Sequence, residues 1–139
     1  MHCCCPPLLS RVVILALAGL AAAGCMSRST GGGGRPPSTR LEISISIRGK
    51  DAPTKLWTLN CPVGGTLPNP ARACSRLEAF DHPFAPVPKG VACTEVYGGP
   101  QTADVRGTFR GRSINAHFAR GNGCEIARWN RVRFLFPSA

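Results

Sequence analysis

The stretch at residues 103–118, ADVRGTFRGRSINAHF, decides the fold of the compact part of this 139-residue chain. Two alternating runs, 103–109 and 112–118, flank the dipeptide Arg110-Gly111, a pattern typical of a tight β-hairpin. Alternate residues of the two strands share one face: Val105, Gly107, Phe109, Ile114, Ala116 and Phe118. Because most of these side chains are apolar, we predict a sheet that buries this face against a second layer.

Other segments extend this sheet. Residues 41–47, LEISISI, alternate strictly and place Leu41, Ile43, Ile45 and Ile47 on one face of a strand. Residues 55–61, KLWTLNC, form the next strand, and residues 132–136, VRFLF, predict a last one. We therefore expect five strands.

One or two short helices complete the expected domain. Residues 71–80, ARACSRLEAF, favour a helix because Cys74, Leu77 and Phe80 recur at a spacing of three. Residues 125–130 predict a second, shorter helix, and the proline-rich residues 83–99 predict a loop. The expected fold is an α+β domain with a five-stranded antiparallel sheet, one or two short helices and two disulfides.

The first 24 residues read as a secretory signal peptide. Arg11 is followed by the apolar run 12–23, VVILALAGLAAA, which is too short to span a bilayer as a mature helix. The run ends in Ala-Gly-Cys, which resembles a bacterial lipobox and predicts lipidation of Cys25. Ordinary cleavage after the Ala-x-Ala at residues 21–23 is the alternative.

Residues 25–40 are expected to be the lipidation site and a flexible tether. Residues 26–39, MSRSTGGGGRPPST, are rich in Gly, Ser and Pro and have almost no apolar content. The folded domain is expected at residues 41–139. This order predicts a secreted protein, or a lipoprotein on the extracellular face of the membrane.

The net charge is strongly positive after the signal. The formal charge is +10, and a single basic residue, Arg11, precedes Cys25. Such a charge favours acidic partners, yet the arginines are scattered along the chain, as they are on a solvated surface.

Cysteine number separates the signal from the domain. Of eight cysteines, four belong to the domain: Cys61, Cys74, Cys93 and Cys124. An even number in a small exported domain predicts two disulfides, for which three connectivities exist. A zinc site is the alternative, but neither a CxxC nor an HxxxH spacing occurs in the domain.

One loop stands out as a candidate binding element. Residues 90–100, GVACTEVYGGP, join an extended strip of small and β-branched residues to an internal cysteine and a Gly-Gly-Pro stop. An extended strip held at its middle by a disulfide can be bound like a substrate without relaxing. An ordinary surface loop that holds a structural cysteine would have the same composition.

Seven short motifs, in order and with four cysteines between them, extend over nearly the whole domain. They are TLNCP at 58–62, GTLPNP at 65–70, ACSRL at 73–77, CTEVY at 93–97, GTFRGR at 107–112, NGCE at 122–125 and VRFLF at 132–136. On these motifs the chain resembles the Streptomyces subtilisin inhibitor family. The resemblance implies an exported protein inhibitor of serine proteases, with disulfides Cys61–Cys74 and Cys93–Cys124.

The resemblance also implies the reactive bond and its surroundings. The bond would be Glu95–Val96, with the Glu95 side chain in the primary specificity pocket of the protease. Further residues of the loop would contact the protease: Val91, Ala92, Cys93, Thr94 and Tyr97. Asn122 would support the loop by hydrogen bonding, and the family's homodimer is a further expectation.

The acidic residue at this position bears on the target. Subtilisin-type pockets prefer large apolar side chains, and burial of a carboxylate in an apolar pocket is costly. The expected partner is therefore an extracellular serine protease, either subtilisin-like or selective for glutamate. The glycine-rich residues 98–101 predict a looser loop after Tyr97.

Other classes of function have weaker support. An enzyme would need a general base, and the domain's two histidines, His82 and His117, are expected to be solvated surface residues. We expect no catalytic site, cofactor, metal or specific nucleic acid. A basic cell-envelope module that binds an anionic polymer or protein partner is the alternative function. It would use the arginines with Trp57, Tyr97 or Trp129, although both tryptophans are expected in the core.

Overall fold

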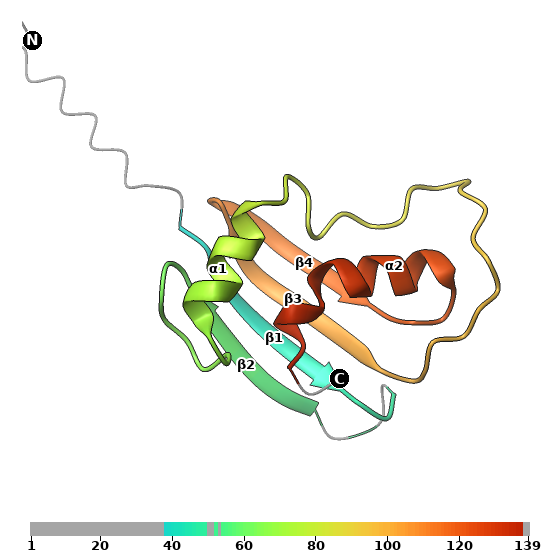
Figure 1. Cartoon of the computed structure of the whole chain (residues 1–139), viewed down its shortest axis with the longest axis horizontal. Helices are drawn as coiled ribbons and strands as arrows, with labels where there is room; N and C mark the ends of the chain where they lie inside the picture. Colours follow the sequence, from blue (N-terminus) through green and yellow to red (C-terminus); the bar gives the residue numbers. More distant parts are fainter. Residues whose placement is uncertain (1–37, 50–51, 53, 138–139) are drawn as a thin grey trace, which may run out of the picture. The chain divides into compact units, whose positions relative to one another are not determined.

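The structure is a computed structural model that describes residues 38–49, 52 and 54–137. The expected signal peptide, Cys25 and most of the tether lie outside the described residues. The described part is a single sheet covered by two helices (Figure 1). The elements, in chain order, are β1 (Arg40–Ser46), β2 (Thr54–Asn60), α1 (Pro70–Glu78), β3 (Thr102–Phe109), β4 (Arg112–Phe118), α2 (Gly123–Val132) and the 3₁₀ helix η1 (Arg133–Leu135).

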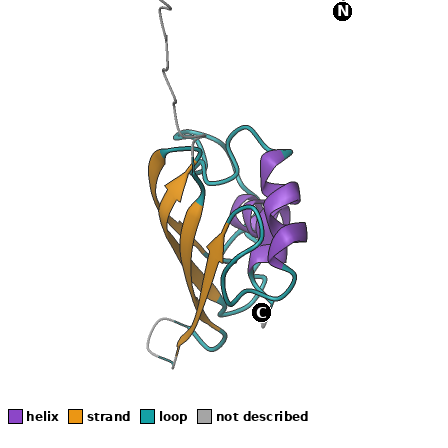
Figure 2. Cartoon of the chain, turned by 90° about the vertical axis from the view of Figure 1, so that its left-hand side faces the viewer, coloured by secondary structure: helices purple, strands orange, loops and turns teal. Residues whose placement is uncertain are grey.

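The sheet has the strand order β2-β1-β3-β4, and each neighbouring pair is antiparallel. The hairpin β3–β4 confirms the prediction from residues 103–118. In the register across three strands, Ile43 lies opposite Val105, which lies opposite Ala116. Both helices cover the same face of this sheet, as Figure 2 shows. The apolar alternation therefore faces the helices, and the polar alternation faces away from them.

Strand β1 is confirmed in its position but ends earlier than expected. Leu41, Ile43 and Ile45 are almost fully buried, whereas Ile47 is 38% exposed. The strand ends at Ser46, so Ile47 lies beyond the last pair of the ladder. At its other end β1 begins at Arg40, and the carbonyl oxygen of Thr39 accepts a hydrogen bond of 3.0 Å from the amide of Cys61.

The expectation of a fifth strand at residues 132–136 is wrong, because the sheet of the described residues has four strands. Residues 132–136 instead end α2 and form η1. The buried residues Trp129, Val132 and Leu135 recur at a spacing of three, which places them on one side of this helical stretch. A short apolar run cannot reveal its period when it is read without the preceding Trp129.

Helix α1 has the expected buried side. Proline occupies its first turn, where the missing N–H removes no helical hydrogen bond. Cys74 and Leu77 are buried against the sheet, and Phe80, just after the helix, stacks on Phe134 with ring centroids 6.4 Å apart. Trp129 is buried in the core and Trp57 packs against it half-buried.

Both disulfides implied by the resemblance are present. Cys61–Cys74 joins the end of β2 to α1, with a Cα–Cα distance of 5.6 Å. Cys93–Cys124 joins the long loop to α2, with a Cα–Cα distance of 5.4 Å. Since all four domain cysteines are oxidised in pairs, they do not form a zinc site. In the chain-entropy account, Cys61–Cys74 stabilises the fold by about 3 kcal/mol and Cys93–Cys124 by about 4 kcal/mol.

Candidate functional site

The candidate site is the long loop that runs from the end of α1 to the start of β3. Residues 79–101 contain neither helix nor strand, and the loop passes around the outside of α2 (Figure 1). Two parts of it differ in their attachment. We call residues 86–92 the leading span and residues 93–98 the clamped segment.

The clamped segment is attached at both ends to residues 120–124, at the entry to α2. At its beginning, Cys93 is bonded to Cys124, and the carbonyl oxygen of Thr94 accepts a hydrogen bond of 2.9 Å from the amide of Gly123. At its end, the amide of Gly98 donates a hydrogen bond of 2.8 Å to the carbonyl oxygen of Arg120. Both attachments therefore lead to the same short piece of chain.

Between these attachments the chain is open to solvent. Glu95 is exposed, Val96 is 55% exposed and Tyr97 is 69% exposed. Adjacent exposed apolar side chains of this kind are candidates for contact with another molecule. The Glu95–Val96 bond thus lies in an exposed stretch with an attachment on each side. We call this stretch, residues 95–97, the arch.

Two glycines allow the arch to approach α2 closely. A Cβ atom on Gly98 would lie 2.8 Å from Cγ1 of Ile126 and 3.2 Å from Cβ of Arg120. A Cβ atom on Gly123 would collide with the hydroxyl of Thr94. The glycine at 98, expected above to loosen the loop, is the place where its exit is attached. From the sequence alone, a glycine that makes a loop flexible cannot be told from one that allows close contact with a neighbouring element.

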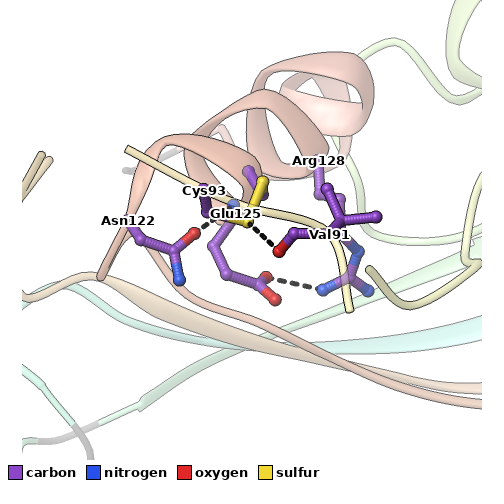
Figure 3. The surroundings of a disulfide bond; sticks show 6 residues. Val91, Cys93, Asn122, Glu125 and Arg128 are labelled. Atoms are coloured by element: carbon purple, nitrogen blue, oxygen red, sulfur yellow. Dashed lines mark hydrogen bonds and ion pairs between the residues drawn. A yellow bond between two sulfur atoms is a disulfide. The ribbon is translucent and has the colours of Figure 1, made fainter. Parts of the chain in front are cut away.

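Asn122 is one of residues 120–124, to which the clamped segment is attached, and its side chain contacts the first turn of α2. Its side-chain oxygen accepts a hydrogen bond of 3.0 Å from the amide of Glu125, which caps the first turn of α2 (Figure 3). The hydrogen bond to the loop is donated by the next residue, Gly123. Asn122 therefore supports the loop through α2, by fixing the turn that carries Gly123 and Cys124.

Arg128 joins α2 to the start of the loop and to the sheet. Its side chain forms an ion pair of 2.6 Å with Glu125, one helical turn earlier (Figure 3). Its Nε donates to the carbonyl oxygen of Ala85 at 2.8 Å, and its guanidinium carbon lies 4.6 Å from the ring centroid of Phe118. The ion pair with Glu125 is partly buried and therefore partly shielded from water, whereas the hydrogen bond to Ala85 is exposed.

Arg120 is held in a similar way. Its Nη1 donates to the side-chain oxygen of Gln101 at 3.0 Å, and its guanidinium lies 6.0 Å from the ring centroid of Trp129. These side-chain contacts restrict the position of Arg120, whose carbonyl oxygen accepts the hydrogen bond from Gly98. Sequence reasoning missed Arg120 and Arg128, since an isolated arginine reads as a surface charge.

The leading span has few attachments. Lys89 and Gly90 form a turn, Val87 is half-buried, and the other residues of the span are exposed. Val91 is 51% exposed, and Ala92 precedes the disulfide. The carbonyl oxygen of Val91 lies 3.7 Å from the Cys93 sulfur (Figure 3), but a disulfide sulfur carries no hydrogen to donate. The span thus crosses from Ala85 to Cys93 with little support.

Glu95 and the two histidines of the domain form no ion pair with one another in the described part of the chain. Glu95 forms no ion pair with any described residue, and His82 is exposed in the loop before the span. His117 lies on the outer face of the sheet, where its Nδ1 is 3.0 Å from Oδ1 of Asp104. Among residues 38–49, 52 and 54–137, no cluster of three metal-ligating side chains occurs, and no helix is long and apolar enough to cross a membrane.

Comparison with known proteins identifies the family. The family model "Subtilisin inhibitor-like" matches residues 37–122, which include the leading span and the clamped segment. The chain belongs to the subtilisin inhibitor-like family. This family comprises inhibitors of serine proteases rather than enzymes.

Two curated relatives agree with this assignment. Subtilisin inhibitor-like protein 1 of Streptomyces cacaoi is 36% identical over 93 residues, which are 62% of this chain and 84% of the relative. A Streptomyces avermitilis protein named "Putative serine protease inhibitor" is 35% identical over 74 residues, which are 52% of this chain and 49% of that relative. The chain thus spans most of the first relative and about half of the second.

Proposed function

We propose that this member of the family inhibits an extracellular serine protease through Glu95–Val96, a reactive bond that the protease meets as a substrate. The observation that carries the proposal is the attachment of an exposed bond on both sides to residues 120–124. An ordinary exposed loop needs no such pair of anchors.

Docking would use the exposed edge of the loop. Val91, Ala92, Cys93 and Thr94 would pair with the protease backbone as an added strand, which satisfies main-chain donors and acceptors on both partners. Glu95 would enter the primary specificity pocket. Val96 and Tyr97 would lie on the leaving-group side, where both are exposed.

The chemistry of inhibition is that of an interrupted hydrolysis. The protease serine attacks the carbonyl carbon of Glu95 and forms an acyl-enzyme, while the amine of Val96 becomes the leaving group. The hydrogen bond from Gly98 to Arg120 keeps this amine close to the acyl carbon. Attack by the amine then restores the peptide bond faster than water hydrolyses the acyl-enzyme.

Rigidity supplies the affinity. The clamped segment is already anchored at both ends, so its docking costs less conformational entropy than the binding of a flexible peptide. The side chains of Arg120 and Arg128 contribute by fixing the segments to which the arch is attached. Tight binding and slow turnover follow from the same anchors.

The target follows from Glu95. A carboxylate loses its hydration in an apolar pocket, whereas a pocket with cationic or hydrogen-bonding groups compensates that loss. A glutamate-selective serine protease is therefore the preferred partner, and subtilisin is the weaker one.

The decisive test is an inhibition assay of the purified protein against both types of protease. We expect inhibition of a glutamate-selective serine protease, and we expect Glu95→Met to shift potency toward subtilisin by at least about 100-fold. Glu95→Gln is the matched control that removes the charge and keeps the shape. Lack of inhibition of either protease, or rapid cleavage at Glu95–Val96, contradicts the proposal.

A salt titration separates the alternative function. Binding of a basic surface to an anionic polymer releases counterions from the polymer. Because this release contributes less free energy at higher salt concentration, the binding weakens steeply as salt is added. Docking of the loop into a protease depends on shape and backbone pairing, so its inhibition constant is expected to change little. Collapse of inhibition at moderate salt would favour the polymer-binding module.

Export and attachment belong to the same proposal. Residues 1–24 would direct secretion, and a lipid on Cys25 with a tether to residue 40 would hold the inhibitor at the outer face of the membrane. The family's homodimer is a further expectation. Mass spectrometry of the mature N-terminus tests lipidation, and Cys25→Ala is expected to release the protein from the membrane fraction.

A further inference from the structure

The leading span carries the single lysine or arginine of the loop at 79–101, Lys89. Lys89 and Gly90 are exposed and form a turn, and Pro86 and Pro88 precede them. Proline disfavours the helical conformation in the residue before it, so Ala85 and Val87 stay extended. Serine proteases bind extended chain, and this span presents one that ends in a lysine.

Little in the described structure opposes rearrangement of this span. The nearest attachments are Ala85, which accepts the hydrogen bond from Arg128, and Cys93 with its disulfide. Segments with few hydrogen bonds and exposed side chains open locally at low cost. The turn at Lys89 can therefore straighten in a protease cleft without unfolding the domain.

The other basic residues of the described part are better protected. Apart from Arg48, Arg110 and Arg120, all of them lie in strands or helices. The carbonyl oxygen of Gly49, next to Arg48, accepts hydrogen bonds from the Ala52 amide and the Ser46 hydroxyl. The amide of Arg110 donates to the Thr39 hydroxyl at 3.2 Å. The side chain of Arg120 donates to Gln101, and its carbonyl oxygen accepts from Gly98.

The connectivity of the disulfides gives a cut here an unusual consequence. Both cysteines of Cys61–Cys74 lie before Lys89, and both cysteines of Cys93–Cys124 lie after it. Hydrolysis of Lys89–Gly90 would therefore leave two pieces without a covalent link. The pairing of β1 with β3, from Arg40 opposite Thr108 to Ser46 opposite Thr102, would hold them together with the core.

We propose that Lys89–Gly90 is an inactivation site, cleaved by a protease selective for basic side chains. Water supplies a hydroxyl to the carbonyl carbon of Lys89 and a proton to the nitrogen of Gly90, and the bond between them breaks. Folding of the cut protein becomes bimolecular, so the inhibitor dissociates and loses activity on dilution. The inactivation, though not the cleavage, rests on the proposed function.

The test is limited digestion of the full chain with trypsin, followed by mass spectrometry and denaturing electrophoresis without reductant. Among the lysines and arginines that the structure describes, the first cut is expected at Lys89–Gly90, and it should give two bands without reductant. Lys89→Gln should slow this cut at least about 100-fold, while Lys89→Arg, the matched control, should keep it. Cuts before residue 38 leave the folded part in one piece and are scored separately.

A second measurement tests inactivation. The cut protein, repurified under native conditions, should inhibit at high concentration and lose at least about tenfold potency on dilution, whereas intact protein should not. A first cut at Arg48, no cut in the folded part, or one band without reductant would overturn the cleavage site. Equal potency of cut and intact protein at every dilution would overturn the inactivation.

These outcomes are separable from the proposed function. The electrophoresis detects the cut whether or not the chain inhibits anything. If the intact chain inhibits no serine protease, the proposed function is wrong and the cleavage site stands. If the intact chain inhibits and Lys89–Gly90 resists trypsin, the cleavage site is wrong and the proposed function stands.

Discussion

The leading span and the clamped segment are neighbours in one loop, and both are exposed to solvent, yet they are attached to the domain in opposite ways. Residues 93–98 have a disulfide and a backbone hydrogen bond at their beginning and a second backbone hydrogen bond at their end. Residues 86–92 lie between the attachments at Ala85 and Cys93 and have almost no attachment of their own. Under the two proposals, exposure alone does not distinguish the inhibitory bond from the cleavable one; the attachments on each side of the bond do.

The two regions also differ in what a cut would separate. Glu95–Val96 lies between the cysteines of one disulfide, so its cleavage would leave both sides covalently joined through Cys93–Cys124. Lys89–Gly90 lies outside both disulfide loops. A difference of six residues in position thus changes the product from a nicked but joined domain to two associated pieces.

Removal of the clamp's disulfide is the change with the largest expected effect. Cys93→Ala with Cys124→Ala should lower the free energy of unfolding by about 4 kcal/mol. The same variant should be consumed as a substrate at Glu95–Val96, because the cleaved ends would no longer be joined. Urea unfolding measures the first effect, and the time course of residual protease activity measures the second.

The other disulfide provides the control. Cys61→Ala with Cys74→Ala should lower the free energy of unfolding by about 3 kcal/mol and leave the inhibitor resistant to turnover. Both variants are compared at a temperature where circular dichroism shows that they are folded. Equally rapid consumption of both would mean that the disulfide at the loop has no special role in inhibition.

Loss of the Arg128 side chain should come next. Arg128→Ala removes charge-assisted hydrogen bonds to Ala85 and Glu125 and the packing on Phe118, and should lower the free energy of unfolding by about 2–3 kcal/mol. Arg131→Ala, an exposed arginine on the same helix, should change it by less than about 0.5 kcal/mol. Equal losses in the two variants would remove Arg128 from the support of the loop.

A methyl group at Gly98 tests the exit of the clamp. Gly98→Ala should push the loop away from Ile126 and Arg120 and raise the inhibition constant about tenfold, or about 1.4 kcal/mol of binding free energy. Gly121→Ala is the matched control, because a Cβ atom there meets no atom within 4 Å. Inhibition constants for both variants decide the matter, and similar values would show that the approach to Ile126 is unimportant.

The smallest effect is expected in the leading span. Pro86→Ala should lower the free energy of unfolding by only about 0.5 kcal/mol, through the greater freedom of the unfolded chain. The inhibition constant should stay within about twofold, since Pro86 lies outside the anchored segment. A large loss of inhibition would show that the leading span, too, is held in place for docking.

The elements with a clear period were predictable from the sequence. Alternation placed Ile43, Val105 and Ala116 on one buried face, and the hairpin turn at Arg110-Gly111 was found at its position. Residues 132–136 were assigned to a strand, because five residues of mixed apolar pattern fit either period. Only the burial of Trp129 together with Val132 and Leu135 reveals the helical period.

By itself, the sequence determined the α+β class, the exposed candidate loop and, through family resemblance, the two disulfide pairs. These depend on local period, composition and motif order, which are properties of neighbours along the chain. The tertiary structure alone decided that Gly98 attaches to Arg120, that Gly123 attaches to Thr94, and that Arg128 reaches Ala85. Such contacts join residues more than 20 positions apart, and a glycine or an arginine carries no local signal of its distant partner. The same limit explains why the sequence does not reveal that Glu95–Val96 has an attachment on each side and Lys89–Gly90 has few.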